Sequence, residues 1–237
     1  MGASAGHLHI GFPGENGAVA VTIPTVTPNT DLTGTLTRTA TQADQLAGAQ
    51  IYVNIHTPTQ PGGELRGQVL RPGEQLFVTT LSGAQEVPVV RSAATAVGWV
   101  ALSADRSSVR YRVAYTGLTP AQGHVHLGPA GTAGPVAFAL TEVGAGVYGG
   151  TATVSAVQAT ALEEARAYFN LHTAAFAGGE LRGQLLAPGA QLFVGELSGA
   201  QEVPLVRTTA SGSVQAVLNY ARNEARYQGV KIGREHV

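Results

Sequence analysis

Short runs of apolar residues, separated by Gly or Pro, recur along most of the chain. Runs of this length, rich in β-branched and aromatic residues, are typical of β-strands, and the Gly and Pro positions mark the turns between them. Residues 108–118 alternate between apolar and polar positions, which predicts a strand with one buried face. The residues of that face are Val109, Tyr111, Val113 and Tyr115. Further strands are predicted over residues 75–81, 97–102, 124–128, 135–140 and 146–154.

One stretch breaks this pattern, because residues 155–167 are rich in Ala and Glu. Thr160 and Glu163 have the spacing of a capping box, in which two side chains reciprocally satisfy the first N–H groups of a helix. We therefore predict a short helix in this stretch and an equivalent one over residues 41–50.

The chain repeats itself. YVNIHTPTQPGGELRGQVL, which begins at Tyr52, returns as YFNLHTAAFAGGELRGQLL at Tyr168, an offset of 116 residues. The segment with LSGAQEVP that begins at Pro72 returns at Pro188. HLHIG at residues 7–11 returns as HVHLG at residues 124–128. Dense identity at one fixed offset indicates a repeat architecture.

The repeat divides the chain into three segments. Residues 1–71 correspond to the C-terminal part of a repeat, residues 72–187 to a complete repeat, and residues 188–237 to the N-terminal part of a further repeat, although His236 could instead begin another truncated HxH motif. A partial repeat leaves apolar faces and strand edges uncovered. Three explanations stay open: the chain is part of a longer array, or the last segment completes the first in the same chain, or it does so in a neighbouring molecule.

Seven or eight short strands per repeat match the size of an immunoglobulin-like sandwich rather than a large barrel. The predicted fold class is all-β, with tandem Greek-key or immunoglobulin-like β-sandwiches and one short helix per repeat.

Composition excludes several classes of protein. Charged residues make up 12% of the chain and the net charge is −1, so no basic surface for nucleic acid is expected. No apolar run approaches the roughly 18 residues of a membrane span. Because the chain has no Cys, disulfides and thiolate metal sites are excluded.

Six of the seven histidines occupy equivalent places in the two repeats. They are His7, His9 and His56, and His124, His126 and His172. Residues two apart in a strand point to the same side, so HxH presents two imidazoles together and the third His can complete a face of three nitrogens. Such a set suits copper or zinc. The alternative, a hydrogen-bonded His pair on the polar face of a strand, is disfavoured because the third His recurs.

The GGELRGQ motif places Glu180, Arg182 and Gln184 on one strand face. Arg182 either attracts an anion to the metal or belongs to a structural network with Glu86 or Glu202, and the second interpretation is favoured. Since carboxylates occur near the histidines only as Glu64 and Glu180, a calcium site is not indicated.

Asn170 shares a strand face with His172 and either fixes the tautomer of that imidazole or hydrogen-bonds at a turn or edge. No catalytic residue is predicted, because the chain has no nucleophile elbow, HExxH motif or phosphate-binding Gly loop.

The motifs LSGAQEVP, GHVHLGPAGTAGPV, YFNLHT and GGELRGQL resemble the CHRD domain, and they occur in the same order. The resemblance covers residues 75–186 and both flanking partial repeats. It implies an immunoglobulin-like sandwich in an extracellular, cell-surface or periplasmic protein.

The HxH strand and the distant third His are also similar to the copper half of the Cu,Zn superoxide dismutase family. That resemblance implies that the six histidines match its copper ligands and that Arg182 and Arg66 match its anion-guiding arginine. It does not extend to the disulfide, the zinc loop or the bridging His of that family.

We therefore predict a secreted or cell-surface CHRD-type protein that binds a transition metal, with copper favoured over zinc. We also predict head-to-tail self-association into an oligomer or filament by strand complementation. Two alternatives stay open: a copper-only enzyme like superoxide dismutase, and a structural filament or matrix protein without metal.

Overall fold

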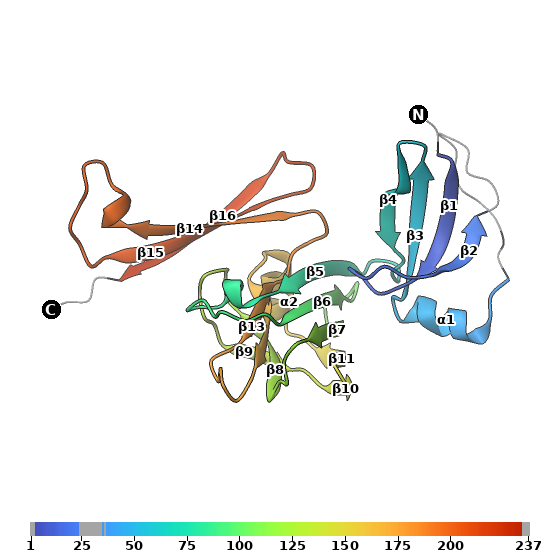
Figure 1. Cartoon of the computed structure of the whole chain (residues 1–237), viewed down its shortest axis with the longest axis horizontal. Helices are drawn as coiled ribbons and strands as arrows, with labels where there is room; N and C mark the ends of the chain where they lie inside the picture. Colours follow the sequence, from blue (N-terminus) through green and yellow to red (C-terminus); the bar gives the residue numbers. More distant parts are fainter. Residues whose placement is uncertain (1–2, 24–34, 36, 234–237) are drawn as a thin grey trace. The chain divides into compact units, whose positions relative to one another are not determined.

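The computed structural model of the 237-residue chain describes residues 3–23, 35 and 37–233, so His236 lies outside the described residues. These residues form several antiparallel sheets and two α-helices, which confirms the predicted all-β class (Figure 1). The chain divides into two compact units, residues 1–74 and 75–237. Neither α-helix in the described ranges has the length and apolar character that crossing a membrane requires.

The first unit contains one four-stranded sheet, sheet A, with strand order β2-β1-β3-β4. Its elements are β1 (Ala5–Ile10), β2 (Val19–Ile23), α1 (Ala40–Ala47), β3 (Ile51–Thr57) and β4 (Gln60–Gln68). The helix α1 begins at a capping box, in which the Thr39 hydroxyl accepts from the Gln42 N–H and the Gln42 side chain accepts from the Thr39 N–H. The helix predicted over residues 41–50 is therefore present as α1.

The second unit contains a complete sandwich of two sheets. Sheet B has the order β10-β11-β7-β6-β5, and sheet C has the order β13-β12-β8-β9. The strands of sheet B are β5 (Gln75–Leu81), β6 (Thr95–Leu102), β7 (Ser108–Thr116), β10 (Glu142–Gly144) and β11 (Val147–Thr153). Those of sheet C are β8 (Gln122–Leu127), β9 (Val136–Ala139), β12 (Ala167–His172) and β13 (Leu181–Gln184). The chain forms β5, β6 and β7 in sheet B, crosses to sheet C for β8 and β9, returns to sheet B for β10 and β11, and ends in sheet C with β12 and β13. Such crossings between two sheets are typical of Greek-key sandwiches.

The core of this sandwich is built from alternate residues of the strands. The predicted inner face of β7 is buried, and it belongs to the same apolar cluster as Phe169, Leu171 and Leu181 of sheet C. Burial of one such side chain stabilises a fold by about 1.5–3 kcal/mol. Alternation along each strand therefore fixes which residues lie inside and which lie on the outer face of the sheet.

The helix α2 (Ala156–Glu163) is shorter than predicted and has a different cap. The hydroxyl of Ser155 accepts from the Gln158 N–H at 3.3 Å, and the Gln158 side chain accepts from the Ser155 N–H at 2.7 Å. The predicted Thr160–Glu163 box is wrong, because Thr160 lies inside the helix and its hydroxyl accepts from Arg106. The Ser–Gln pair has the same spacing and precedes the residues of α2 that pack into the core.

Sheets B and C are joined along one edge by main-chain hydrogen bonds. Val78 of β5 exchanges two bonds with Leu186, at 2.8 and 3.2 Å. Ser82 exchanges two bonds with Arg182, at 3.0 and 3.2 Å. β5 is therefore bonded to β6 on one side and to the β13 region on the other.

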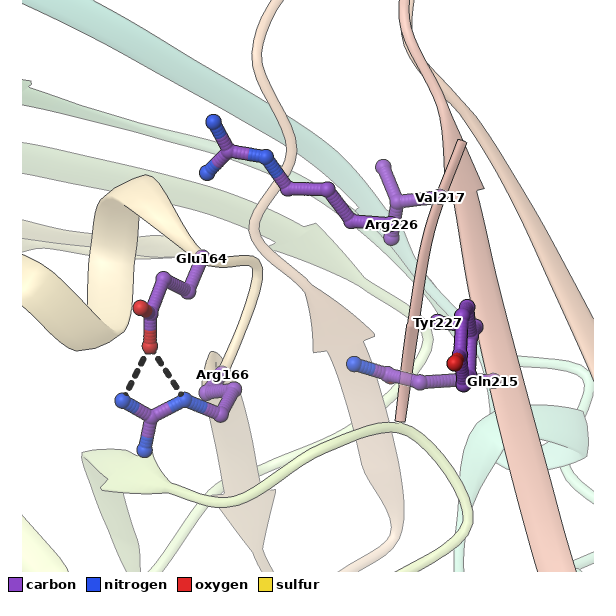
Figure 2. Close-up of a pocket in the computed structure, with 6 residues that line it drawn as sticks. All are labelled: Glu164, Arg166, Gln215, Val217, Arg226 and Tyr227. Atoms are coloured by element: carbon purple, nitrogen blue, oxygen red, sulfur yellow. Dashed lines mark hydrogen bonds and ion pairs between the residues drawn. The ribbon is translucent and has the colours of Figure 1, made fainter. Parts of the chain in front are cut away.

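The second unit also contains a three-stranded sheet, sheet D, with the order β14-β15-β16. Its strands are β14 (Gln191–Ser198), β15 (Ser211–Leu218) and β16 (Ala225–Gly233). Figure 2 shows a hollow lined by Glu164 and Arg166, which form an ion pair, and by side chains of β15 and β16. Among the latter, Gln215 is buried and its Oε1 accepts from the Ala130 N–H at 2.6 Å. The candidate metal ligands lie elsewhere.

Candidate metal centres

The six predicted ligands lie in two clusters, one in each unit. In the second unit, His124 and His126 lie on β8 and His172 ends the adjacent β12. The residues that alternate with them, among them Val125 and Leu171, belong to the core. The imidazoles therefore lie on the outer face of sheet C.

In the first unit, His7 and His9 of β1 and His56 of β3 form the equivalent cluster on sheet A. In each cluster, one nitrogen from every ring lies within 4.8 Å of the other two. Metal–imidazole bonds are about 2.0–2.1 Å long. Small ring movements would therefore bring three nitrogens onto one ion.

Main-chain carbonyls fix two rings of the second cluster. Nδ1 of His126 lies 2.8 Å from the carbonyl oxygen of Gly134, and Nδ1 of His172 lies 3.0 Å from that of Ala177. Because a carbonyl only accepts, each Nδ1 carries the hydrogen and each Nε2 keeps its lone pair. Within the described residues, both Nε2 atoms and Nδ1 of His124 are buried without a hydrogen-bond partner. Such nitrogens fit a metal ion, which would satisfy all three.

The first cluster has the same pattern. Nδ1 of His9 lies 2.9 Å from the carbonyl oxygen of Gly17, and Nδ1 of His56 lies 2.9 Å from that of Pro61. Nδ1 of His7 lies 2.9 Å from Nε2 of His56, so it donates a hydrogen bond to that lone pair. A metal ion would take the place of this hydrogen.

The surroundings favour neutral imidazoles. Burial lowers the pKa of His124, and the neighbouring His172 and His126 lower it further. Burial also lowers the pKa of His126, and the pKa of His7 is lowered in the same way, first by loss of water and then by His56 and His9. The neutral ring is the form that binds a metal, so the lowered pKa values in both clusters favour metal binding.

A Tyr–Arg layer supports the second cluster. The ring of His126 stacks on Tyr168 with centroids 5.1 Å apart, and the guanidinium carbon of Arg182 lies over the Tyr168 ring, 3.6 Å from its centroid. The Tyr168 hydroxyl accepts from the Gly134 N–H at 3.0 Å. No residue with a side chain fits at position 134, because a Cβ there would overlap the carbonyl oxygen of Leu127. Tyr168 therefore holds the loop whose carbonyl orients His126.

Arg182 hydrogen-bonds to the same loop, which precedes Gly134. Its guanidinium donates to the carbonyl oxygens of Thr132 and Pro129 at 2.8 Å each and to Oε1 of Gln184 at 3.2 Å. The side chain is only 2% exposed. This arrangement favours the structural interpretation of Arg182 over attraction of an anion from solvent.

Of the two interpretations of Asn170, the one in which it fixes the tautomer of His172 does not hold, because Nδ1 of His172 bonds to the carbonyl oxygen of Ala177 instead. Asn170 is buried, and its side chain lies beside Gly179, close to the Glu86 carboxyl. Asn170 therefore belongs to the region where the GAQEVP segment meets sheet C.

The glutamates of the GGELRGQ motifs are engaged by hydroxyl groups rather than by the histidines. Glu180 accepts from Thr173 and from Ser92, both at 2.7 Å. Glu64 accepts from Thr57. Each candidate centre among the described residues therefore consists of imidazoles alone.

Sequence reasoning did not single out Tyr168 or its equivalent Tyr52. Tyr52 stacks on His9 with centroids 4.8 Å apart and lies under Arg66 at 3.6 Å, as Tyr168 does with His126 and Arg182. The available signal was the sequence Y-x-N-x-H in both repeats, since residues at spacing two share one strand face.

The two centres differ in how deeply the Arg side chain beside each of them is buried. Arg66 donates to the carbonyl oxygen of Glu15 at 2.8 Å and contacts the Tyr52 ring, yet its side chain is exposed. Arg182, with the same type of partners, is buried because β5 and the GAQEVP segment lie beside β13.

Glu86 of that GAQEVP segment gives the complete sandwich a pH-dependent stability. Burial raises the pKa of its carboxyl from 4.5 to about 7, and the charge of Arg182 offsets this only in part. The folded state therefore binds the proton more tightly than the unfolded chain does. The stabilisation that comes from proton binding by Glu86 is complete below the pKa of this carboxyl in the unfolded chain, which is 4.5. It is lost as the pH rises from there through the folded pKa of about 7.

We expect Glu86→Gln, which resembles the protonated carboxyl, to change stability little at pH 5. At pH 8 the variant should exceed the wild type by about 2 kcal/mol. Trp99 is the only Trp and is buried in sheet B, so its fluorescence follows this sandwich during denaturant unfolding. Glu202→Gln changes an exposed side chain and is the matched control. Equal effects of Glu86→Gln at both pH values would contradict the prediction.

Comparison with known proteins agrees with the motifs. Neither a comparison with curated proteins nor one with solved structures gave a match. The model of the CHRD domain family matches residues 2–69 and again residues 77–185. These segments make up more than half of the chain and contain both histidine clusters. The chain therefore belongs to the CHRD domain family, of which it carries two matched segments in tandem.

Proposed function

We propose that the protein binds a transition metal at its two three-histidine centres. The observation that carries the proposal is the convergence of three buried nitrogens of the second cluster that have no hydrogen-bond partner among the described residues. Leaving such groups unsatisfied costs about 1–3 kcal/mol each. A bound ion would remove that cost and would hold the imidazoles together.

Copper is the metal that we propose, with zinc as the alternative. Three neutral imidazoles form a borderline ligand set, and binding strength for such sets rises along the Irving–Williams order to a maximum at copper. In each cluster, main-chain carbonyls hold the opposite nitrogen of two rings, and such carbonyls are usual supports of metal-bound His. Three ligands also leave a coordination position for water or another small ligand.

The proposed role is metal holding rather than superoxide conversion. The guanidinium of Arg182 is buried and directed at Thr132 and Pro129, so it is not presented to an incoming anion. An assay of superoxide consumption by the copper-loaded protein tests this, and a rate above that of free copper would favour the enzyme alternative.

Metal content is the direct test of the proposal. The protein, purified without chelator, is loaded with Cu²⁺ or Zn²⁺, passed through a desalting column and measured by elemental mass spectrometry. We expect close to two equivalents of copper per chain, one for each cluster. A protein that retains no metal after loading would contradict the proposed function.

We further propose an extracellular, cell-surface or periplasmic location, which rests on membership of the CHRD family.

A second candidate function, head-to-tail self-association into an oligomer or filament, is supported by a separate observation. Residues at core positions of the repeat are exposed in sheets A and D: Leu65 is 63% exposed and Phe193 is 53% exposed. Exposed apolar positions of this kind are characteristic of contact surfaces.

A further inference from the structure

Sheet A has an inner face that nothing in the first unit covers fully. Leu65 of β4 is exposed, whereas Leu181, at the equivalent position of the complete sandwich, is fully buried. A cavity of about 200 Å³ on this face is lined by largely apolar residues, including Leu8, Leu46 and Ile51. Leu162, the equivalent of Leu46, belongs to the core of the complete sandwich. Sheet A is therefore built to be covered by a second sheet.

Sheet D has the complementary face. Phe193, Leu197 and Tyr227 are exposed, whereas the equivalent Phe77, Leu81 and Tyr111 belong to the core of the complete sandwich. The exposed residues lie on the inner face of the sheet by register with sheet B. Gln215, which contacts Ala130, lies on the opposite face because it alternates with the inner positions of β15.

The complete sandwich shows how the two kinds of sheet fit. Besides apolar packing, the contact is made by the main-chain bonds of Val78 with Leu186 and of Ser82 with Arg182. At an offset of 116 residues these positions are Val194 with Leu70 and Ser198 with Arg66. β4 and β14 are outer strands of sheets A and D, so each offers an edge for this pairing.

We propose that sheet D of one copy covers the inner face of sheet A in a second copy, and that β14 pairs with β4. This rests on the proposed self-association and names its contact surfaces. The two faces lie in different units of the chain and complement each other in shape of sheet and in charge, so every copy offers one face of each kind, and a second copy is the occupant that we propose. Because the surfaces differ, the contact is head-to-tail and continues into rings or open filaments.

Polar groups match across the proposed contact as well. In the complete sandwich Ser92 donates to Glu180 at 2.7 Å, and Glu86 lies beside Arg182. The equivalent pairs are Thr208 with Glu64 and Glu202 with Arg66, and these four side chains are exposed in the single chain. The incoming sheet thus supplies Arg66 with a carboxylate next to the first histidine cluster.

Disulfide trapping tests the pairing, since the chain has no native Cys. Residues that exchange two main-chain bonds have Cα atoms about 5.5 Å apart, within the disulfide range of about 4.4–6.8 Å. We expect the double variant Leu70→Cys, Val194→Cys to give a ladder of covalent multimers under mild oxidation. Each single variant should give no ladder, and Val78→Cys with Leu186→Cys is the positive control within one chain.

A disulfide closed within one chain would overturn the proposed occupant in favour of intramolecular closure. No disulfide, with the positive control intact, would overturn the proposed pairing. Light scattering separates this failure from that of self-association, because a wild type that stays monomeric at high concentration would contradict self-association altogether. Metal content is measured on the same samples, so the metal proposal stands or falls independently.

Charge substitutions give a second test. Leu65→Asp and Phe193→Asp alter side chains that are exposed in the single chain, so both variants should fold. Each alone should be monomeric, because one of its two surfaces is blocked. An equimolar mixture should give a dimer of twice the mass and nothing larger. Assembly of either variant by itself to the wild-type size would overturn the proposal.

Discussion

Replacement of His126 by Ala is expected to lower the copper content from two equivalents per chain to one. His126 supplies one of three nitrogens in the second cluster, and its Nε2 is buried and directed toward the other two rings. Loss of a residue that only supports a ligand weakens metal binding by about 10–100-fold. Loss of the ligand itself should exceed that range, so the remaining pair cannot retain copper through desalting.

The repeat provides the control for this experiment. His9→Ala removes the equivalent ligand of the first cluster and should also leave one equivalent, while the double variant should retain none. Tryptophan fluorescence and circular dichroism confirm that each variant is folded. Full copper retention by the double variant would show that the histidine clusters are not the metal sites.

Sequence patterns predicted the strands of the complete sandwich well, because the alternation of apolar and polar residues and the Gly and Pro positions of the turns are both local features of the sequence. Alternation along β7 placed Val109, Tyr111, Val113 and Tyr115 on one face, and all four are buried as expected. The cap of α2 was misplaced because two residue pairs, Ser155–Gln158 and Thr160–Glu163, have the required spacing. Only packing of the helix against the core distinguishes them.

The histidine clusters were predictable because HxH spacing and strand pairing place three rings on one face. Their supports were not predictable in the same way. The carbonyls of Gly134 and Ala177 belong to loops, and any residue has a carbonyl, so no side-chain pattern marks them. Two interpretations of Asn170 stayed open for the same reason, since the partners of its side chain depend on where the loop around Gly179 runs.

The difference in burial between Arg182 and Arg66 was likewise beyond local patterns, because the two GGELRGQ motifs are identical. What differs is the neighbouring strand: β13 meets β5 through Ser82, while β4 ends the order of sheet A. Identical side chains therefore make different contributions to stability in the two units.

Replacement of Arg182 by Ala is expected to destabilise the complete sandwich by about 3 kcal/mol or more. The guanidinium is buried on Tyr168 and supplies donors to the carbonyls of Thr132 and Pro129. Truncation leaves these acceptors unpaired in a buried site, and it also leaves the Glu86 carboxyl without its positive neighbour. Denaturant unfolding followed by Trp99 fluorescence measures the loss.

Two further variants separate the possible causes. Arg166→Ala breaks the partly exposed ion pair with Glu164 in the same unit, and it should cost no more than about 1 kcal/mol. Arg182→Lys keeps the charge but loses the planar fork that reaches both carbonyls, so it should recover less than half of the lost stability. Recovery of full stability by Lys would show that charge beside Glu86, rather than fastening of the loop, is the contribution of Arg182. If Arg182→Ala were as mild as Arg166→Ala, the loop would be held without it, and the orientation of His126 would have to rest on Tyr168 alone.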